Sequence, residues 1–150
     1  MDAIRALADY DTTQYIVIQV GEEQYGIDIK FVENIVRMQS ITRVPSVQYY
    51  FKGVINLRGE VVPVMSLRRK LKLDDDVISD KTRIIIIKLE ANAPVGVIVD
   101  EVKEVVTIEN STIDSVARSS KKDEQSFING IGKSNGGLIS LLDLNTVISE

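Results

Sequence analysis

Apolar residues recur along the chain in short runs, some alternating with polar residues and some uninterrupted, and glycine or polar pairs bound the runs. Both patterns are typical of β-strands. Pairs of runs separated by Gly21-Glu22 and by Arg58-Gly59 predict tight hairpins. The expected strands lie at 15–20, 23–29, 51–57, 60–65, 83–89, 94–99 and 103–108, with a last hairpin at about 127–142.

A few segments depart from the strand pattern. Residues 28–36 change to a helical period, which predicts a brief helix or helical turn between strands. The apolar residues at this spacing are Phe31, Val32, Ile35 and Val36. Residues 66–71 are expected to form a helical turn opened by a serine cap, and 144–148 a closing turn. Residues 40–48 are expected to be a loop with an extended edge.

The same outline occurs twice in the chain. Residues 15–36 (YIVIQVGEEQYGIDIKFVENIV) reappear with one inserted residue at 84–106 (IIIIKLEANAPVGVIVDEVKEVV). In the same order, 53–71 correspond to 130–148. Because the copies share apolar alternation and glycine, the repetition specifies the fold, and the differences between the copies are the better guide to function.

The repetition predicts an all-β fold of two small five-stranded barrels with short helical turns, because no connection is long enough to carry repeated crossover helices. The expected repeats are 14–79 and 80–150 within one domain. Whether each barrel is built wholly from its own copy stays open, since pseudo-twofold duplications often exchange a strand. The acidic run 74–76 lies between the copies and is expected to be a solvated loop.

Composition excludes several classes of function. The chain has no cysteine and no histidine, which removes thiol nucleophiles, thiolate metal sites and the usual general base near neutral pH. The remaining reactive side chains form no visible catalytic constellation. We therefore expect no enzyme, no catalytic residue, no cofactor and no metal site. A net charge of −4 with mixed signs does not fit a nucleic-acid-binding protein either.

The sequence also predicts a location. The first residues lack the apolar core of a signal peptide. The longest purely aliphatic run, 84–87, is far shorter than the ~20 residues needed to cross a bilayer. We therefore expect a cytoplasmic protein that does not insert into a membrane.

Two features are candidates for partner contact. Arg58 precedes the turn glycine of the first copy, where the second copy has Asn135. An arginine at a hairpin end points outward and can pair with the carboxylates or carbonyls of a partner, although it can also bond to its own hairpin. The turn that carries Val32 and Ile35 is the other candidate. Its apolar residues either plug the end of a barrel or dock a partner helix.

Four segments, in this order and spacing, resemble the CheW family of bacterial chemotaxis coupling proteins. They are EEQYGIDIKFVENIV, ITRVP, FKGVINLRGEVVPVMSLRRKL and VGVIVDEVKEVVTI. The resemblance runs from about Gln14 to Val147 and implies two SH3-like barrels packed around a shared hydrophobic interface, without catalysis. The same fold forms the regulatory domain of the histidine kinase CheA. Because the 150 residues contain no kinase or receiver segment, the free-standing adaptor is the closer match.

Members of this family bridge the CheA regulatory domain and the helical cytoplasmic tips of chemoreceptors, within receptor arrays at the membrane. Carried over by position, the resemblance implies a receptor-facing groove formed by Val32, Ile35, Arg58 and Ile84. It implies a kinase-facing surface formed by Ile41, Thr42, Arg43, Pro45 and Gly53. At position 34 the chain has Asn where some relatives carry a glutamate able to pair with the arginine matching Arg58. A CheW-like module serving another sensory kinase is the alternative.

Overall fold

The computed structural model describes residues 11–90, 93–115, 127–134 and 136–149, and most of their regular structure is β-strand. The predicted all-β fold is therefore confirmed. The strands are β1 (Thr12–Val20), β2 (Glu23–Asp28), β3 (Val32–Arg37), β4 (Phe51–Leu57), β5 (Glu60–Ser66), β6 (Arg83–Ile87), β7 (Val95–Val99), β8 (Glu101–Glu109), β9 (Asp114–Ser115), β10 (Ile128–Ser134) and β11 (Gly137–Leu142). The helical turns are η1 (Ile29–Phe31), α2 (Leu67–Lys70), η2 (Asn110–Thr112) and α3 (Leu144–Ile148).

The hairpins expected from the sequence are present as β1–β2, β4–β5 and β10–β11. The predicted serine cap is also confirmed, because the Ser66 hydroxyl accepts a hydrogen bond from the Arg69 amide at 3.1 Å, where α2 begins. Local sequence chemistry thus determines these turns before any long-range contact is considered.

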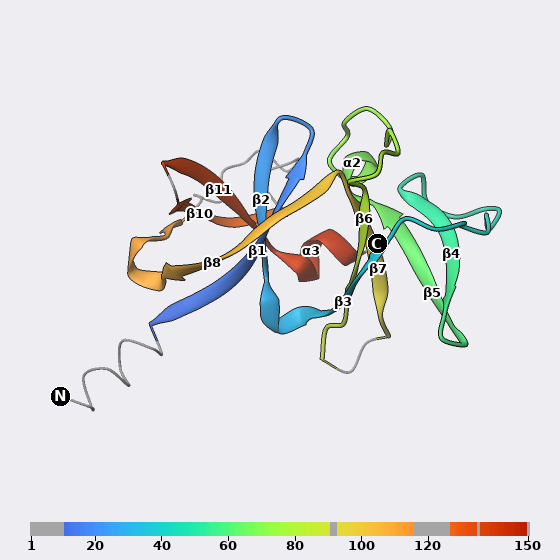
Figure 1. Cartoon of the computed structure of the whole chain (residues 1–150), viewed down its shortest axis with the longest axis horizontal. Helices are drawn as coiled ribbons and strands as arrows, with labels where there is room; N and C mark the ends of the chain where they lie inside the picture. Colours follow the sequence, from blue (N-terminus) through green and yellow to red (C-terminus); the bar gives the residue numbers. More distant parts are fainter. Residues whose placement is uncertain (1–10, 91–92, 116–126, 135, 150) are drawn as a thin grey trace.

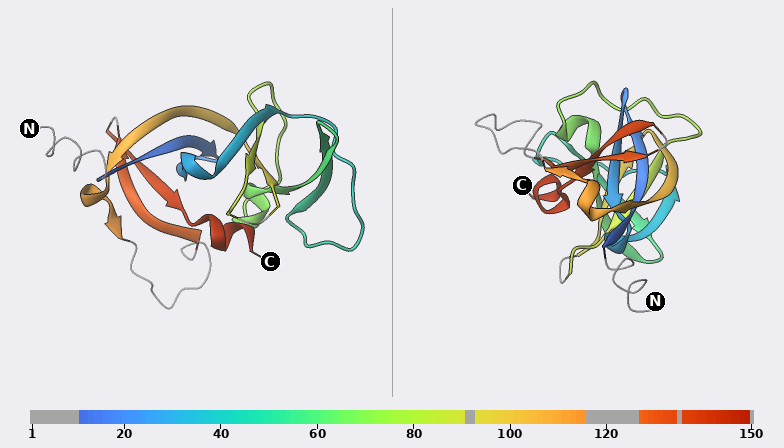
Figure 2. Two further views of the ribbon diagram at one scale, coloured as in Figure 1. Left: turned by 90° about the horizontal axis from the view of Figure 1, so that it is seen from below. Right: turned by 90° about the vertical axis from the view of Figure 1, so that its left-hand side faces the viewer.

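The strands form two mixed sheets, each curled into a rounded body (Figures 1 and 2). Sheet A has the order β8-β1-β2-β11-β10-β9, and sheet B has the order β3-β6-β7-β5-β4. Sheet A is six-stranded rather than five-stranded because the two-residue strand β9 pairs with β10. We call the two bodies barrel A and barrel B.

Each barrel combines strands from both sequence copies. The first two strands of copy one, β1 and β2, lie in barrel A, whereas β3, β4 and β5 lie in barrel B with β6 and β7 of copy two. A boundary near residue 79 therefore does not separate the two sheets. The crossing strands join the barrels into one body, since neither sheet is complete without both halves of the chain.

The two parallel strand pairs are equivalent in the repeat. Val64 of β5 pairs with Gly96 of β7, and Leu141 of β11 pairs with Gly26 of β2. Glycine is required at both positions by close packing, because an added Cβ would lie 2.8 Å from Ile84 Cγ2 at Gly96 and 2.8 Å from Leu141 Cδ2 at Gly26. The glycines shared by the copies thus allow the exchanged strands to pack closely.

Three apolar clusters explain why the central strands carry so few polar residues. One cluster fills barrel A, one fills barrel B, and the largest lies between the barrels. The last takes residues from both sheets and from α3, which runs between the two bodies (Figure 2). Its buried members are Ile16, Ile18, Val20, Tyr25, Ile27, Met65, Leu67, Leu71, Ile85, Ile87, Leu89, Val97, Val99, Leu142, Leu144 and Val147.

Strand β6 is buried on both faces for this reason. Ile84 and Ile86 point into barrel B, whereas Ile85 and Ile87 point into the cluster between the barrels. A strand with two buried faces needs an uninterrupted apolar run rather than alternation. The four consecutive isoleucines therefore place β6 at the centre of the fold.

The helical turn predicted over 28–36 is wrong beyond Phe31. Only η1 is helical, and Val32–Arg37 form strand β3, which pairs with β6. A bulge between Val32 and Asn34 shifts the register, so that Val32 opposes Ile87 and Ile35 opposes Ile85 on one face. A spacing of three residues on one face imitates helical periodicity, which explains the wrong prediction.

Gly53 allows a close approach of two backbone segments. It has φ +141°, and an added Cβ would lie 2.1 Å from the Thr42 carbonyl oxygen. Thr42 forms an isolated bridge with the next residue, Val54, through two backbone hydrogen bonds of 2.8 Å. Gly53 therefore holds the loop that follows β3 against β4.

We expect Gly53→Ala to lower the free energy of unfolding by about 3 kcal/mol, because it combines an unfavourable φ with a steric overlap. The matched control is Gly59→Ala, since Gly59 has φ +84° but no atom within 4 Å of the added Cβ. Urea denaturation of both variants measures the difference. Equal destabilisation of the two variants would show that the approach to Thr42 is not tight.

Candidate functional site

Val32 and Ile35 lie on β3, an edge strand of sheet B. Their partners across the ladder, Ile87 and Ile85, belong to the cluster between the barrels, so both side chains lie on the face of the sheet that is turned toward barrel A. Val32 packs against that cluster, whereas Ile35 is 37% exposed. We call these two residues the β3 surface, an apolar strip on the edge strand of barrel B.

Ile84 does not belong to an exposed surface. It opposes Val36 on the inner face of barrel B and has no exposed area. The expectation that Ile84 faces a partner is therefore wrong for direct contact. The family resemblance located the residue in the sheet by position, but neighbouring positions of a strand point to opposite faces.

Arg58 lies at the tip of the β4–β5 hairpin and is exposed. The turn is closed by Asn56, whose Oδ1 accepts a hydrogen bond from the Gly59 amide at 2.9 Å. Among the residues that the structure describes, the Arg58 guanidinium makes no hydrogen bond or ion pair, so the alternative that it bonds to its own hairpin is not seen. Asn34 is occupied locally, since its Oδ1 accepts from the Ile35 amide at 2.8 Å.

Arg58, in the β4–β5 turn, and the β3 surface lie toward opposite edges of sheet B. They are connected through the interior of barrel B, because Leu57, the neighbour of Arg58, and Val36, the neighbour of Ile35, pack against the same cluster. A substitution in that interior would therefore disturb both surface features.

The residues expected to face a kinase do come together. Thr42 and Gly53 are in backbone contact, as described above, and Ile41, Arg43 and Pro45 line a cleft of about 570 Å³ beside them. The loop after β3, the start of β4, α2 and the segment around residue 76 form its walls. We call this hollow the loop cleft.

The rim of the loop cleft is apolar and exposed. Val44 and Val47 belong to the loop after β3, Tyr49 precedes β4, and Ile78 comes from the chain between the copies. Sequence reasoning missed this group because its members come from separate stretches of the chain that show no strand or helix periodicity. Exposed apolar residues gathered around a cleft are typical of protein-interaction surfaces.

The acidic run 74–76 is not a simple solvated loop, contrary to expectation. Asp75 accepts two hydrogen bonds from Arg69, at 3.0 and 2.7 Å, and one from Lys52 Nζ at 2.9 Å. These hydrogen bonds from Arg69, then from Lys52, lower the pKa of Asp75. The loop is thereby tied to α2 and β4, because the basic residues that follow the serine cap lie beside it.

Asp76 turns inward from the same loop. Its side chain is 3% exposed, and Lys52 Nζ lies 3.9 Å from Oδ2. Burial raises the pKa of Asp76, and the Ser66 hydroxyl and Lys52 offset only part of that effect. No sequence signal distinguishes this carboxylate from its two neighbours.

One ion pair lies where the two barrels meet. Asp100, between β7 and β8, accepts hydrogen bonds from Arg68 Nε at 2.9 Å and Nη2 at 2.7 Å. It also accepts from the amide of Gly21, in the β1–β2 turn of barrel A, at 2.8 Å. Burial alone raises the pKa of Asp100, but the hydrogen bonds from Arg68 and Gly21 outweigh it and the net pKa is lowered. The pair ties α2 of barrel B to barrel A.

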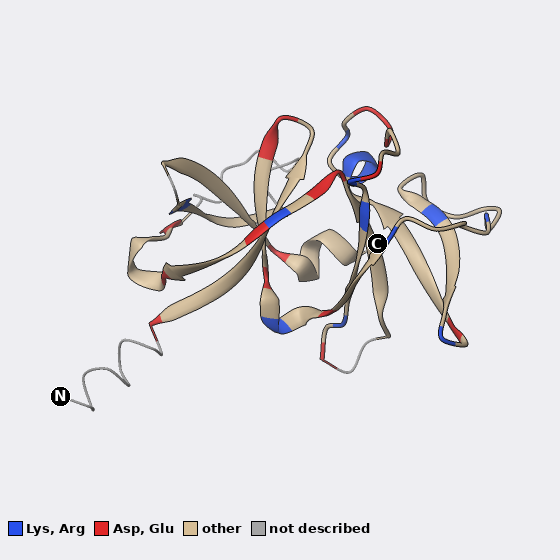
Figure 3. Ribbon diagram, viewed as in Figure 1, with Lys and Arg blue, Asp and Glu red and all other residues tan. Residues whose placement is uncertain are grey.

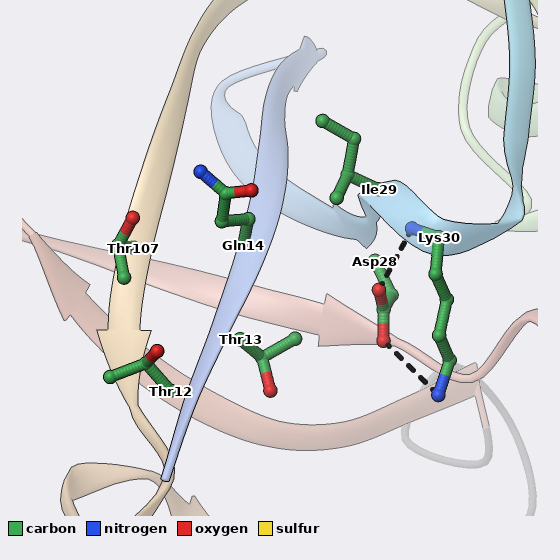
Figure 4. Close-up of a pocket in the computed structure, with 7 residues that line it drawn as sticks. All are labelled: Thr12, Thr13, Gln14, Asp28, Ile29, Lys30 and Thr107. Atoms are coloured by element: carbon green, nitrogen blue, oxygen red, sulfur yellow. Dashed lines mark hydrogen bonds and ion pairs between the residues drawn. The ribbon is translucent and has the colours of Figure 1, made fainter. Parts of the chain in front are cut away.

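A second hollow, of about 510 Å³, lies on barrel A (Figure 4). Its two charged residues neutralise each other: the Lys30 amide donates to Asp28 Oδ1 at 3.1 Å, and Lys30 Nζ lies 3.8 Å from Oδ2. The lining residues are Thr12, Thr13, Gln14, Asp28, Ile29, Lys30 and Thr107. This polar hollow contains no residue expected from the sequence to bind a partner, and we assign it no function.

The described ranges, 11–90, 93–115, 127–134 and 136–149, contain neither a metal-binding cluster nor a membrane-spanning helix. No group of three or more Asp and Glu side chains is arranged there to hold a metal ion. Within the same ranges, no helix has the length and apolar character to span a bilayer.

Comparisons with known proteins give one consistent family. Residues 14–150 match the family described as "CheW-like domain". The chain is 42% identical over 135 residues to the chemotaxis protein CheW of Bacillus subtilis (strain 168), covering 90% of this chain and 86% of that protein. It is 31% identical over 140 residues to the CheW of Helicobacter pylori, covering 93% and 84%.

A solved structure supports the same relationship. The crystal structure of the scaffolding protein TtCheW from Thermoanaerobacter tengcongensis matches with a TM-score of 0.83 and 31% identity. The match covers 92% of this chain and 93% of that one. Sequence and fold therefore agree over nearly the whole length of the chain.

We expect Asp100→Asn to lower the free energy of unfolding by about 2 kcal/mol at pH 7, because Arg68 and the Gly21 amide lose a charged acceptor. The folded pKa of Asp100 lies below the ordinary value of 3.8, so the stabilisation is complete above 3.8 and is lost as pH falls through the folded pKa. The stability difference between wild type and variant should therefore shrink in acid.

Urea unfolding across this pH range measures the difference. Asp114→Asn, at an exposed position on β9, is the matched control and should change stability little. A difference that is absent at pH 7, or that persists unchanged in acid, would contradict a stabilising ion pair.

Proposed function

The chain belongs to the CheW family, and on that premise we propose that it is a non-enzymatic adaptor that couples the histidine kinase CheA to the cytoplasmic tips of chemoreceptors. The observation that carries the proposal is the family match over residues 14–150, together with a fold match of the same extent. The adaptor acts in the cytoplasm and is recruited to receptor arrays at the membrane.

Two separate surfaces support an adaptor function. The β3 surface offers an apolar strip on an edge strand beside the junction of the barrels, with exposed Arg58 on the same barrel. A helical hairpin, such as a receptor tip, presents apolar side chains in the rows that such a strip accepts. We assign Val32, Ile35 and Arg58 to receptor binding, with Ile84 as internal support.

The loop cleft is the surface that we assign to the kinase. Ile41, Arg43 and Pro45 line it, and the Thr42–Gly53 contact fixes its position. The apolar side chains exposed on its rim are typical of a surface that a protein partner covers. The cleft is built by the loop after β3, α2 and the chain around residue 76, so its walls are distinct from the β3 surface.

We expect Arg58→Ala to weaken binding of a receptor-tip fragment by about 1 to 2 kcal/mol, because an exposed guanidinium that pairs with a partner is lost. The melting temperature should not change, since the Arg58 side chain makes no hydrogen bond or ion pair within the described part of the chain. Isothermal titration with the receptor fragment, alongside thermal melting, provides the test. Unchanged affinity, or loss of the fold, would remove Arg58 from the receptor surface.

We expect Val47→Asp to weaken binding of the CheA regulatory domain by about 2 kcal/mol, because it places a charge on the apolar rim of the loop cleft. Val105→Asp is the matched control, since Val105 is 52% exposed on β8 of barrel A and Val47 is 43% exposed. Titration of both variants with the regulatory domain checks the expectation. Equal affinities for the two variants would place the kinase elsewhere.

The same titrations distinguish an adaptor of CheA from a CheW-like module that serves another sensory kinase. Wild-type binding to both the CheA regulatory domain and the receptor fragment supports the coupling function. Binding to the regulatory domain of a different sensory kinase, and not to that of CheA, would instead assign the chain to another signalling system.

A further inference from the structure

Charge is divided unequally between the two barrels. Residues 29–99, which form all of sheet B, contain 12 Lys and Arg against 7 Asp and Glu. The other described residues, which form sheet A and α3, contain 2 Lys and Arg against 10 Asp and Glu. Figure 3 shows the basic residues gathered on barrel B. Although the net charge of the chain is only −4, barrel B is therefore basic and the described part of barrel A is acidic.

Several of the basic residues on barrel B are already neutralised. Arg68 is paired with Asp100, and Arg69 and Lys52 are paired with Asp75. These intramolecular ion pairs neutralise the three basic side chains, which therefore attract an acidic partner only weakly.

Arg37 and Arg83 differ from these residues. They oppose each other directly across the β3–β6 ladder, and neither guanidinium forms an ion pair within the described part of the chain. Like charges at directly opposed positions of a sheet destabilise it. Arg83 Nη1 donates to the carbonyls of Asp80 and Thr82, at 2.8 and 2.9 Å. These bonds hold one terminal nitrogen of the Arg83 guanidinium but bring no negative charge to it.

The arginine pair continues the β3 surface. Ile35 opposes Ile85 and Arg37 opposes Arg83, two positions further along the same ladder, so these side chains share one face of the sheet. Arg37 is exposed and Arg83 is partly exposed. The apolar strip thus ends in two directly opposed arginines.

We propose that Arg37 and Arg83 together bind a carboxylate of the partner that docks on the β3 surface, so that the partner helix carries an acidic side chain beside its apolar contacts. This inference rests on the proposed receptor-binding function and adds the charge of the partner to it. A carboxylate between the two guanidinium groups accepts hydrogen bonds from both and removes their repulsion.

The distribution of charge favours a single carboxylate over an extended polyanion. A nucleic acid or an anionic membrane covers a wide surface, and its charge would meet the acidic residues of barrel A as well as the arginine pair. A helix that presents one acidic residue next to apolar ones touches only the β3 surface and the arginine pair. The long-range attraction of barrel B for an acidic partner also steers association and weakens in salt.

Arg37→Glu is the decisive variant because it separates binding from folding. A glutamate at position 37 opposes Arg83 and replaces a like-charge pair by an opposite-charge pair, so the melting temperature should stay the same or rise. Affinity for a receptor-tip fragment of the same organism should fall about tenfold or more, because attraction of the partner carboxylate becomes repulsion. The dependence of affinity on salt should also become weaker.

The matched control is Lys133→Glu, the same change of charge at an exposed position of β10 in barrel A, which should leave receptor affinity unchanged. A charge-reversal scan of the acidic positions of the receptor fragment should contain one Glu→Lys or Asp→Lys change that restores binding to the Arg37→Glu variant. Recovery of this kind identifies the partner carboxylate directly.

Each other outcome is informative. If Arg37→Glu binds the fragment as tightly as the wild type does, the arginine pair does not bind a partner carboxylate, but the proposed receptor-binding function still holds. Wild type that does not bind the fragment overturns both. Loss of binding to phosphatidylglycerol vesicles, with receptor affinity intact, would show that the pair recognises lipid headgroups and would overturn the carboxylate assignment.

Discussion

Burial of the central strands on both faces is the constraint on which the rest of the structure depends. Ile16, Ile18 and Val20 of β1 pack between the barrels, whereas Val17 packs inside barrel A. Strand β6 repeats the arrangement in barrel B. A slip of one residue in either strand would exchange its two buried faces and mismatch both clusters. The large cluster between the barrels therefore fixes register, strand exchange and the mutual position of the barrels together.

The same constraint determines which residues remain for binding. Because the central strands are buried, the exposed side chains that we assign to partner binding lie on the edge strand β3, at a hairpin tip and on the loop after β3. The β3 surface lies on the face turned toward the cluster between the barrels, and the loop cleft lies against α2. Arg68 of α2 is tied to Asp100 and through it to Gly21 of barrel A. In the adaptor that we propose, a partner on either surface contacts the same two-barrel body, and coupling between the partners is a binding free energy shared through that body.

Sequence reasoning succeeded where structure is local and failed where it is not. Hairpins at Gly21-Glu22 and Arg58-Gly59 and the Ser66 cap follow from turn chemistry, and all are present. Strand β3 was mistaken for a helical turn because the bulge at Val32 to Asn34 is set by pairing with β6. The burial of Asp76 depends on contacts distant in sequence, so no local pattern distinguishes it from Asp75. Which face of β6 Ile84 takes is likewise set by the register with its neighbouring strands. The apolar rim of the loop cleft is assembled from separate stretches of the chain, which no local pattern brings together.

In the adaptor that we propose, one two-barrel body carries two partners on separate surfaces at the same time. Sedimentation velocity of the protein mixed with the CheA regulatory domain and a receptor-tip fragment shows whether both partners bind together. We expect a ternary complex, with affinity for either partner maintained or increased when the other is bound. Mutually exclusive binding, in which each partner displaces the other, would contradict it.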